Sequence, residues 1–199
     1  MSFPTLTIML PDWVARFLGQ RPATCPTTEE RMELVLALAG ENVRRGGGPF
    51  AAAIFEEQTG RLVAPGVNLV VSLNCSLAHA EMVAIGIAQQ QAGTFDLGMS
   101  GMPALQLVTS TEPCAMCLGA IPWSGVRSIA CSARGEDAEK IGFDEGDKPV
   151  SWVNGLLRRG IAVSRDVMRE KGIAVLAGYA ELGGIIYNGR QAAGANRKQ

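Results

Sequence analysis

One histidine, one glutamate and two cysteines stand in a pattern that suits metal-assisted hydrolysis. His79 is the single histidine of the chain, and Glu81 follows it by two residues. Cys114 and Cys117 are three residues apart, so at a helix start both sulfurs lie on one face and can bind one tetrahedral ion. Three protein ligands leave the fourth position of zinc for water, as in a catalytic site. Glu81 is then placed to take a proton from that water.

Each part of this pattern also has a simpler interpretation. Cys-x-x-Cys can be a redox pair, although Met116 between the cysteines does not suit a thioredoxin-like motif. A lone histidine at a helix start can be a cap or a packed core residue. Cys75 or Cys131 can supply a fourth ligand, which would make the zinc site structural. The combination favours a catalytic site, because His-x-Glu followed by Pro-Cys-x-x-Cys is the signature of zinc-dependent base deaminases.

Strands that alternate with helices must position these residues. Thr27 and Glu30 form a capping-box pattern before a helix that ends at the glycines near residue 46. The expected strands are 50–55, 62–71 with an interruption at Pro65-Gly66, 104–110, 126–132 and 160–163. The later expected helices are 79–91, 114–121 and 165–179, with a helical turn at 137–141. This order predicts an α/β domain whose sheet is covered on both faces.

Composition limits the class of protein. The chain has 199 residues with 47% apolar and 19% charged residues, which fits one globular domain and excludes disorder as its main state. No apolar run is long enough for a membrane span and no secretory signal is expected, so we expect no membrane partner. Five cysteines then indicate a reducing, cytoplasmic setting. The net charge of −1 and the scattered basic pairs do not favour nucleic acid as a partner.

Residues 46–187 resemble the cytidine deaminase-fold superfamily and, within it, the bacterial guanine deaminases. Beyond the zinc pattern, four features carry this resemblance: Gly47-Gly48-Pro49-Phe50, Asn68, Trp123 and Ile141-Gly142-Phe143-Asp144-Glu145. The resemblance implies a three-layer α/β/α sandwich with a central mixed sheet, Zn²⁺ as cofactor and a homodimer. The sequence before Pro26 reads as an N-terminal arm over 1–25, and low complexity indicates a flexible tail over 190–199. Between them we expect a deaminase domain over 26–189, which includes the C-terminal lid that the resemblance implies.

The resemblance assigns residues to a nucleobase pocket. Phe50 packs against the base, Asn68 hydrogen-bonds its edge, and Trp123 matches a pocket aromatic residue. Glu145 stands at a position where the family often has aspartate, and it contacts the substrate amine. The substrate-binding residues expected on this basis are Phe50, Asn68, Ala80, Trp123, Phe143 and Tyr187.

The C-terminal segment 183–188 resembles a tyrosine-bearing segment that covers the active site in the guanine branch. Tyr187 then belongs to a lid, supplied by the same chain or by a partner subunit. Such a lid excludes water and completes the pocket. The alternative interpretation is an ordinary edge strand.

These features together predict a zinc-dependent hydrolase that converts guanine to xanthine and ammonia. Glu81 moves a proton from the attacking water, and Glu145 holds or protonates the amino group. Aminotriazines present a similar edge and are a second expected substrate. The alternatives are a tRNA adenosine deaminase or a nucleoside deaminase of the same fold, and a non-catalytic zinc-stabilised interaction module. Glu81 disfavours the last of these, because a structural zinc site needs no adjacent carboxylate.

Overall fold

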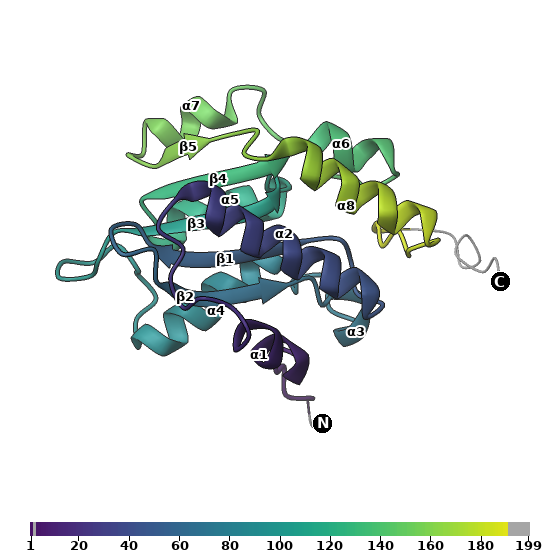
Figure 1. The fold of residues 1–199 in the computed structure, drawn as a ribbon, viewed down its shortest axis with the longest axis horizontal. Helices are drawn as coiled ribbons and strands as arrows, with labels where there is room; N and C mark the ends of the chain where they lie inside the picture. The colour runs from purple at the N-terminus through teal and green to yellow at the C-terminus, as the bar shows by residue number, and fades with distance from the viewer. Residues whose placement is uncertain (2, 191–199) are drawn as a thin grey trace.

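A mixed five-stranded sheet forms the centre of the computed structural model, which describes residues 1 and 3–190 (Figure 1). The strands are β1 (Ala51–Glu56), β2 (Leu62–Val67), β3 (Leu105–Thr111), β4 (Ser128–Ala133) and β5 (Ala162–Ser164). They lie in the order β2-β1-β3-β4-β5. β1 pairs antiparallel with β2 and β3, whereas β4 pairs parallel with β3 and β5. The predicted mixed sheet is therefore confirmed.

Helices cover both faces of this sheet and complete three layers (Figure 1). The helices are α1 (Asp12–Leu18), α2 (Thr28–Arg44), α3 (Val70–Leu73), α4 (Ala80–Ala92), α5 (Ala115–Ser124), α6 (Gly135–Lys140), α7 (Trp152–Leu157) and α8 (Arg169–Glu181). α2 and α8 contact β1, β3 and β4, while α4 contacts β1 and β2 from the other side and packs against α5. The predicted α/β/α sandwich is confirmed.

Strand β1 contributes side chains to two apolar clusters, one on each face of the sheet. Ala53 and Phe55 are buried with α2 in one apolar cluster. Ala52 and Ile54, which alternate with them, are buried in a second cluster with α4 residues such as Ala84. Successive side chains of a strand point to opposite faces, so a strand that is apolar throughout needs helices on both sides.

The capping box predicted for α2 is present. The Glu30 backbone N–H donates to Thr27 Oγ1 at 3.2 Å, and the Thr27 N–H donates to the Glu30 carboxylate at 2.8 Å. These two bonds satisfy backbone donors that a helix start leaves unpaired. The start of α2 is therefore set by local sequence.

Three segments differ from the sequence prediction. The strand predicted over 62–71 is wrong beyond Val67, because Asn68 Oδ1 accepts the Val70 N–H at 3.2 Å and the chain turns into α3. The last helix begins at Arg169 rather than at residue 165, because Asp166 and Met168 adopt left-handed backbone angles with φ of 62° and 54°. The short helix α7 was not predicted.

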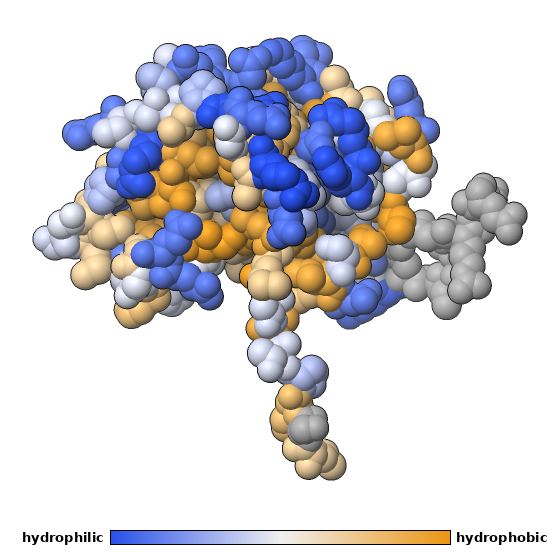
Figure 2. All heavy atoms as spheres, turned by 60° about the horizontal axis from the view of Figure 1, so that its bottom comes forward, coloured by the Kyte–Doolittle hydropathy of each residue, from blue (hydrophilic) through white to orange (hydrophobic). Residues whose placement is uncertain are grey.

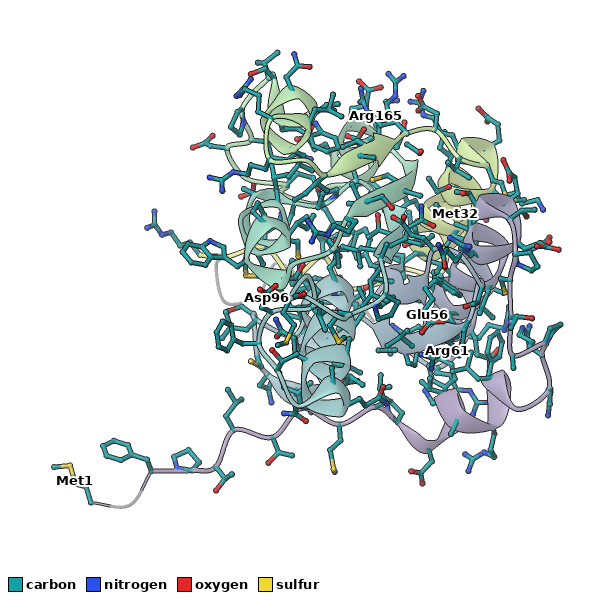
Figure 3. The ribbon with its side chains drawn as sticks, turned by 90° about the vertical axis from the view of Figure 1, so that its left-hand side faces the viewer. Met1, Met32, Glu56, Arg61, Asp96 and Arg165 are labelled. Atoms are coloured by element: carbon teal, nitrogen blue, oxygen red, sulfur yellow. The ribbon has the colours of Figure 1, made fainter. Side chains whose placement is uncertain are left out.

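The two ends of the chain differ in how they meet the core. In α1, Trp13 and Val14 are buried in the same cluster as α2, so this part of the predicted arm packs on the domain. Figure 3 shows Met1 at the end of a segment that extends away from the body. Except for Arg190, the predicted tail over 190–199 lies outside the described residues. Within the described residues, no helix has both the length and the apolar character that a membrane crossing requires.

Candidate active site

The predicted metal ligands come together where two helices begin. His79 is the N-cap residue of α4, and Cys114 is the N-cap residue of α5, with Cys117 in the first turn. His79 Nδ1 lies 3.5 Å from Cys114 Sγ and 3.7 Å from Cys117 Sγ. A tetrahedral zinc ion, with bonds of about 2.3 Å to sulfur and about 2.05 Å to nitrogen, separates such ligand atoms by about 3.6 Å. The observed spacing therefore fits zinc.

The charges at this site also fit a divalent cation. A hydrogen bond from Cys117 is the main cause that lowers the pKa of Cys114 to about 4; burial opposes this effect, and His79 adds to it. The same hydrogen bond, together with burial, raises the pKa of Cys117. Two adjacent buried thiols cannot both ionise without a cation, and zinc supplies the charge that lets both become ligands. Neither Cys75 nor Cys131 belongs to the ligand group formed by the described residues, which leaves one zinc position for water.

Glu81 lies in the first turn of α4, two residues after the histidine ligand. Its side chain is buried, and it lines the same cavity as His79 and Cys114. Burial raises the pKa of Glu81, and the nearby Cys114 thiolate raises it further. A carboxylate with a raised pKa beside the metal position can accept a proton and pass it on.

A cavity of about 330 Å³ opens beside the ligand group. This volume is near the lower end of the range for small-molecule sites, about 300–1,000 Å³. The predicted site residues that line it are Phe50, His79, Glu81, Cys114, Phe143, Glu145 and Tyr187. The tertiary structure thus collects residues from both halves of the chain around one small cavity.

Aromatic rings form one wall of the cavity around Phe143. The ring centroid of Phe143 lies 4.9 Å from that of Phe50 and 4.9 Å from that of Tyr187, both at steep angles. Tyr179 stacks on Phe143 at 6.0 Å from the side of α8. Such an aromatic wall suits a flat, neutral ring system.

Glu145 supplies a second buried carboxylate. Burial raises its pKa to about 7, and the nearby ammonium of Lys148 opposes this shift. The backbone carbonyl of Glu145 accepts the Ala115 N–H at 2.9 Å, which fixes the Glu145 loop to the start of α5. Two carboxylates with raised pKa values therefore face the same cavity.

Asn68 and Tyr187 are buried with unused hydrogen-bonding groups. Neither Asn68 Nδ2 nor the Tyr187 hydroxyl has a hydrogen-bond partner among the described residues. Both lie beside Gly48, where a Cβ atom would be 2.5 Å from the Tyr187 hydroxyl and 3.0 Å from Asn68 Oδ1. A buried polar group without a partner costs about 1–3 kcal/mol, which a polar ligand can recover. Gly48 is what allows this close approach.

Residues 187–188, part of the segment predicted as a lid, lie at the cavity within the same chain. Tyr187 lines the cavity, and residues 184–188 form no strand, so the edge-strand interpretation is wrong. Asn188 Oδ1 accepts the Asp144 N–H at 2.9 Å, and Asn188 Nδ2 donates to the Gly142 carbonyl at 2.8 Å. These bonds join the lid to the loop of Glu145.

Three expected substrate contacts, Asn68, Trp123 and Ala80, are not among the residues that line the cavity within one chain. Trp123 is 84% exposed near the end of α5, because six residues of helix after Cys117 turn it away from the ligand group. Ala80 is buried in the second apolar cluster, and its carbonyl lies against Gly66. Two residues that contact the Glu145 loop were not predicted from the sequence. Asn188 entered only as the last residue of segment 183–188, and no periodic pattern marks Lys148.

Comparison with known proteins agrees with this geometry. The family model of the cytidine and deoxycytidylate deaminase zinc-binding region matches residues 26–133. The chain is 38% identical over 128 residues to the guanine deaminase of Bacillus subtilis, covering 61% of this chain and 78% of that protein. It is also 32% identical over 103 residues to a tRNA-specific adenosine deaminase of Agrobacterium fabrum, covering 52% of this chain and 63% of that protein.

Solved structures extend the similarity over most of the chain. The guanine deaminase of Nitrosomonas europaea is 46% identical and superposes with a TM-score of 0.85, covering 89% of this chain and 97% of that one. A structure in complex with 2,6-diaminopurine is 47% identical, with a TM-score of 0.87 and coverage of 94% and 98%. The ligand geometry, the fold and the matched zinc-binding region lead to one conclusion: the chain belongs to the cytidine and deoxycytidylate deaminase family of zinc enzymes.

Proposed function

We propose that this chain is a guanine deaminase, a hydrolase that converts guanine and water to xanthine and ammonia. The observation that carries the proposal is a single small cavity in which a three-ligand zinc site, two buried carboxylates and an aromatic wall meet. The similarity to guanine deaminases over most of the chain supports the choice of substrate.

Glu81 performs the central proton transfer. Zinc bound by His79, Cys114 and Cys117 supplies Lewis acidity, which makes water a nucleophile at neutral pH. Glu81 lies within the same cavity, and its raised pKa suits it to take a proton from the attacking water. It then delivers that proton to the ring nitrogen next to the carbon under attack. The new C–O bond forms as this nitrogen is protonated.

Glu145 acts on the leaving group. Its carboxylate faces the cavity, and in its charged form it can accept a hydrogen bond from the 2-amino group. As the C–N bond breaks, the added hydroxyl releases the second proton of the water, a carboxylate passes that proton to the departing nitrogen, and the nitrogen leaves as ammonia. Two carboxylates near the same centre allow one to serve the water and the other to serve the amine.

The remaining pocket residues hold the base. Phe50 and Phe143 form one apolar wall against which the flat base packs, so that their rings replace water there. We assign the unpaired Asn68 Nδ2 and the Tyr187 hydroxyl to polar atoms at the edge of the base. The cover formed by Tyr187 leaves little room for a ribose, which favours a free base over a nucleoside.

Ammonia release from a panel of substrates tests the proposal. Purified zinc-loaded protein is incubated separately with guanine, adenine, cytosine, cytidine and an aminotriazine. We expect rapid release from guanine, slower release from the aminotriazine, and little from the others. No release from guanine by zinc-loaded protein contradicts the assignment, and inosine formation in tRNA would revive the tRNA deaminase alternative.

Domain limits, location and assembly complete the proposal. Residues 26–189 form the catalytic unit, and the chain works in the cytoplasm, where its five cysteines, free in this structure, remain reduced. It acts as a homodimer, supported by the exposed apolar side chains of Trp123 and Leu182. Figure 2 shows further apolar surface on the face from which the N-terminal arm extends. Light scattering at several concentrations tests the dimer, and a monomer throughout would contradict it.

A further inference from the structure

A half-buried lysine, Lys148, pairs with the carboxylate of Glu145. Lys148 Nζ is 3.3 Å from Glu145 Oε2, and the two side chains are only 14% and 7% exposed. Glu145 lines the cavity, whereas Lys148 does not. Lysine is rarely buried unless it is paired, because its charge loses solvation. The ammonium is therefore held against one oxygen of Glu145 by a residue that does not itself line the cavity.

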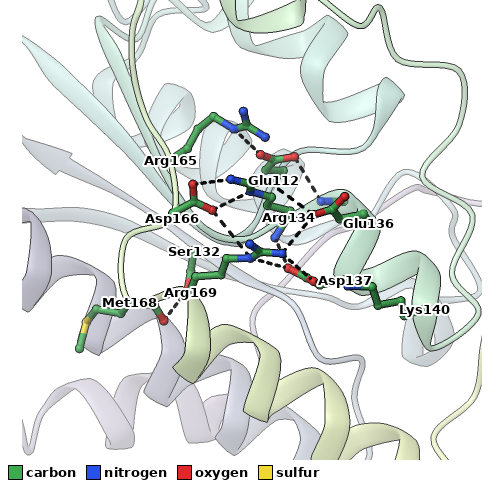
Figure 4. A network of polar contacts seen from close by, with 11 residues as sticks. Glu112, Ser132, Arg134, Glu136, Asp137, Lys140, Arg165, Asp166, Met168 and Arg169 are labelled. Carbon is green, nitrogen blue, oxygen red and sulfur yellow. Dashed lines mark hydrogen bonds and ion pairs between the residues drawn. The ribbon is translucent and has the colours of Figure 1, made fainter.

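The space for this ammonium is made by Gly135 at the start of α6. A Cβ atom at Gly135 would lie 2.4 Å from Lys148 Nζ. The Gly135 N–H in turn donates to Glu112 Oε2 at 3.2 Å, and Glu112 Oε1 accepts from Arg165 at 2.6 Å. Figure 4 shows Glu112 and Arg165 as part of a larger network of ion pairs. Lys148 therefore packs against a surface that buried polar contacts hold in place.

The backbone of the Glu145 loop is fixed, but its carboxylate depends on the lysine. Hydrogen bonds fix the loop to Ala115 in α5 and to Asn188 in the lid, both at 2.9 Å. Among the described residues, the Glu145 carboxylate accepts its hydrogen bond from Lys148. One oxygen is thus occupied by the ammonium, while the carboxylate still faces the cavity.

We propose that Lys148 is a positioning residue for deamination: its half-buried ammonium orients the Glu145 carboxylate toward the amino group of the substrate. This inference rests on the proposed function, and it assigns Lys148 no contact with the base. An unpaired carboxylate could turn toward Gly135 or rotate freely, and a small displacement of a reacting group is costly. Replacing the hydrogen-bond partner of a metal ligand typically costs about 10–100-fold in metal affinity or activity, and we expect a loss of the same scale for the partner of a substrate-facing carboxylate.

The test compares three lysine variants and one double variant. Lys148→Met removes the charge while keeping the length of the side chain, Lys148→Arg keeps the charge, and Lys140→Met is the control because Lys140 is an exposed lysine paired with Asp137. We expect kcat/KM for guanine to fall about 10–100-fold in K148M, to recover to within about fivefold of wild type in K148R, and to remain unchanged in K140M. In the Glu145→Gln background, K148M should cause no further loss, because the carboxylate that it orients is gone.

Zinc content, melting temperature and a crystal structure of K148M separate positioning from general damage. We expect full zinc content and a Glu145 carboxylate turned away from the cavity. K148M activity within threefold of wild type, a further loss in the double variant, or an unmoved carboxylate overturns the proposal. If K148M does not fold, K148R decides, and a loss of more than tenfold in K148R overturns it. If wild-type protein releases no ammonia from guanine, the proposed function fails, while the carboxylate position in K148M still decides this inference.

Discussion

Replacing Glu81 by glutamine should remove turnover while leaving the metal site and the fold intact. The substitution keeps the size of the side chain and changes only its ability to accept a proton. General acid–base catalysis by a positioned group contributes about 10²–10⁴-fold. We therefore expect kcat for guanine to fall by that factor, which corresponds to about 3–5 kcal/mol of activation free energy.

The burial of Glu81 also predicts the effect on stability. Glutamine matches glutamate in size and fills the same buried space, so the melting temperature of E81Q should stay close to that of wild type. The three zinc ligands are untouched, so metal content should stay at one ion per chain.

Ammonia release measured by a coupled assay, together with metal analysis and thermal unfolding, checks this prediction. Glu139→Gln is the matched control, because Glu139 is an exposed glutamate on α6. Retention of activity within tenfold of wild type in E81Q would refute the role of Glu81 as the proton carrier. Loss of zinc in E81Q would instead show that Glu81 helps to hold the metal.

Three further predictions concern the lid, the metal and the acid stability of the fold. Gly48→Ala places a methyl group 2.5 Å from the Tyr187 hydroxyl, so the lid must move and KM for guanine should rise about tenfold or more. Gly178→Ala, where no atom lies within 4 Å of the added carbon, should leave KM unchanged. Removing zinc with a chelator should abolish ammonia release and lower the melting temperature, because the ion binds only the folded state. Added zinc should restore both, and an unchanged melting temperature would contradict the metal site. Hydrogen bonds from Arg169 are the main cause that lowers the pKa of Asp137 in the folded protein. The stability that the charged Asp137 contributes is therefore present above the unfolded pKa and is lost as the pH falls toward the folded pKa. Asp137→Asn should cost about 2 kcal/mol at pH 7, and the difference from wild type should shrink between about pH 5 and pH 2 in thermal unfolding. A difference that does not depend on pH would contradict this reasoning.

Local sequence patterns predicted the elements whose boundaries depend on nearby residues. The capping box of Thr27 and Glu30 fixes the start of α2, and the strand around residues 51–56 follows from a short apolar run. The strand expected to reach Val71 ends early, because the Asn68 side chain accepts the Val70 N–H in a local turn, which overrides the strand preference of Val70 and Val71. The intrinsic strand preference of a segment therefore decides its structure only where no nearby side chain offers the backbone a competing hydrogen bond.

The sequence by itself determined the metal chemistry of this protein. Cys114 and Cys117 are three residues apart at a helix start, so both thiols lie on one face and can bind the same ion. The meeting of Phe50, Glu145 and Tyr187 was suggested by family resemblance, but only the tertiary structure decided that one chain brings them to a common cavity. It also decided that Trp123 faces away from that cavity, and that Lys148 pairs with Glu145 over the space left by Gly135. These contacts join segments far apart in the chain, and long-range packing rather than local spacing determines which of them touch.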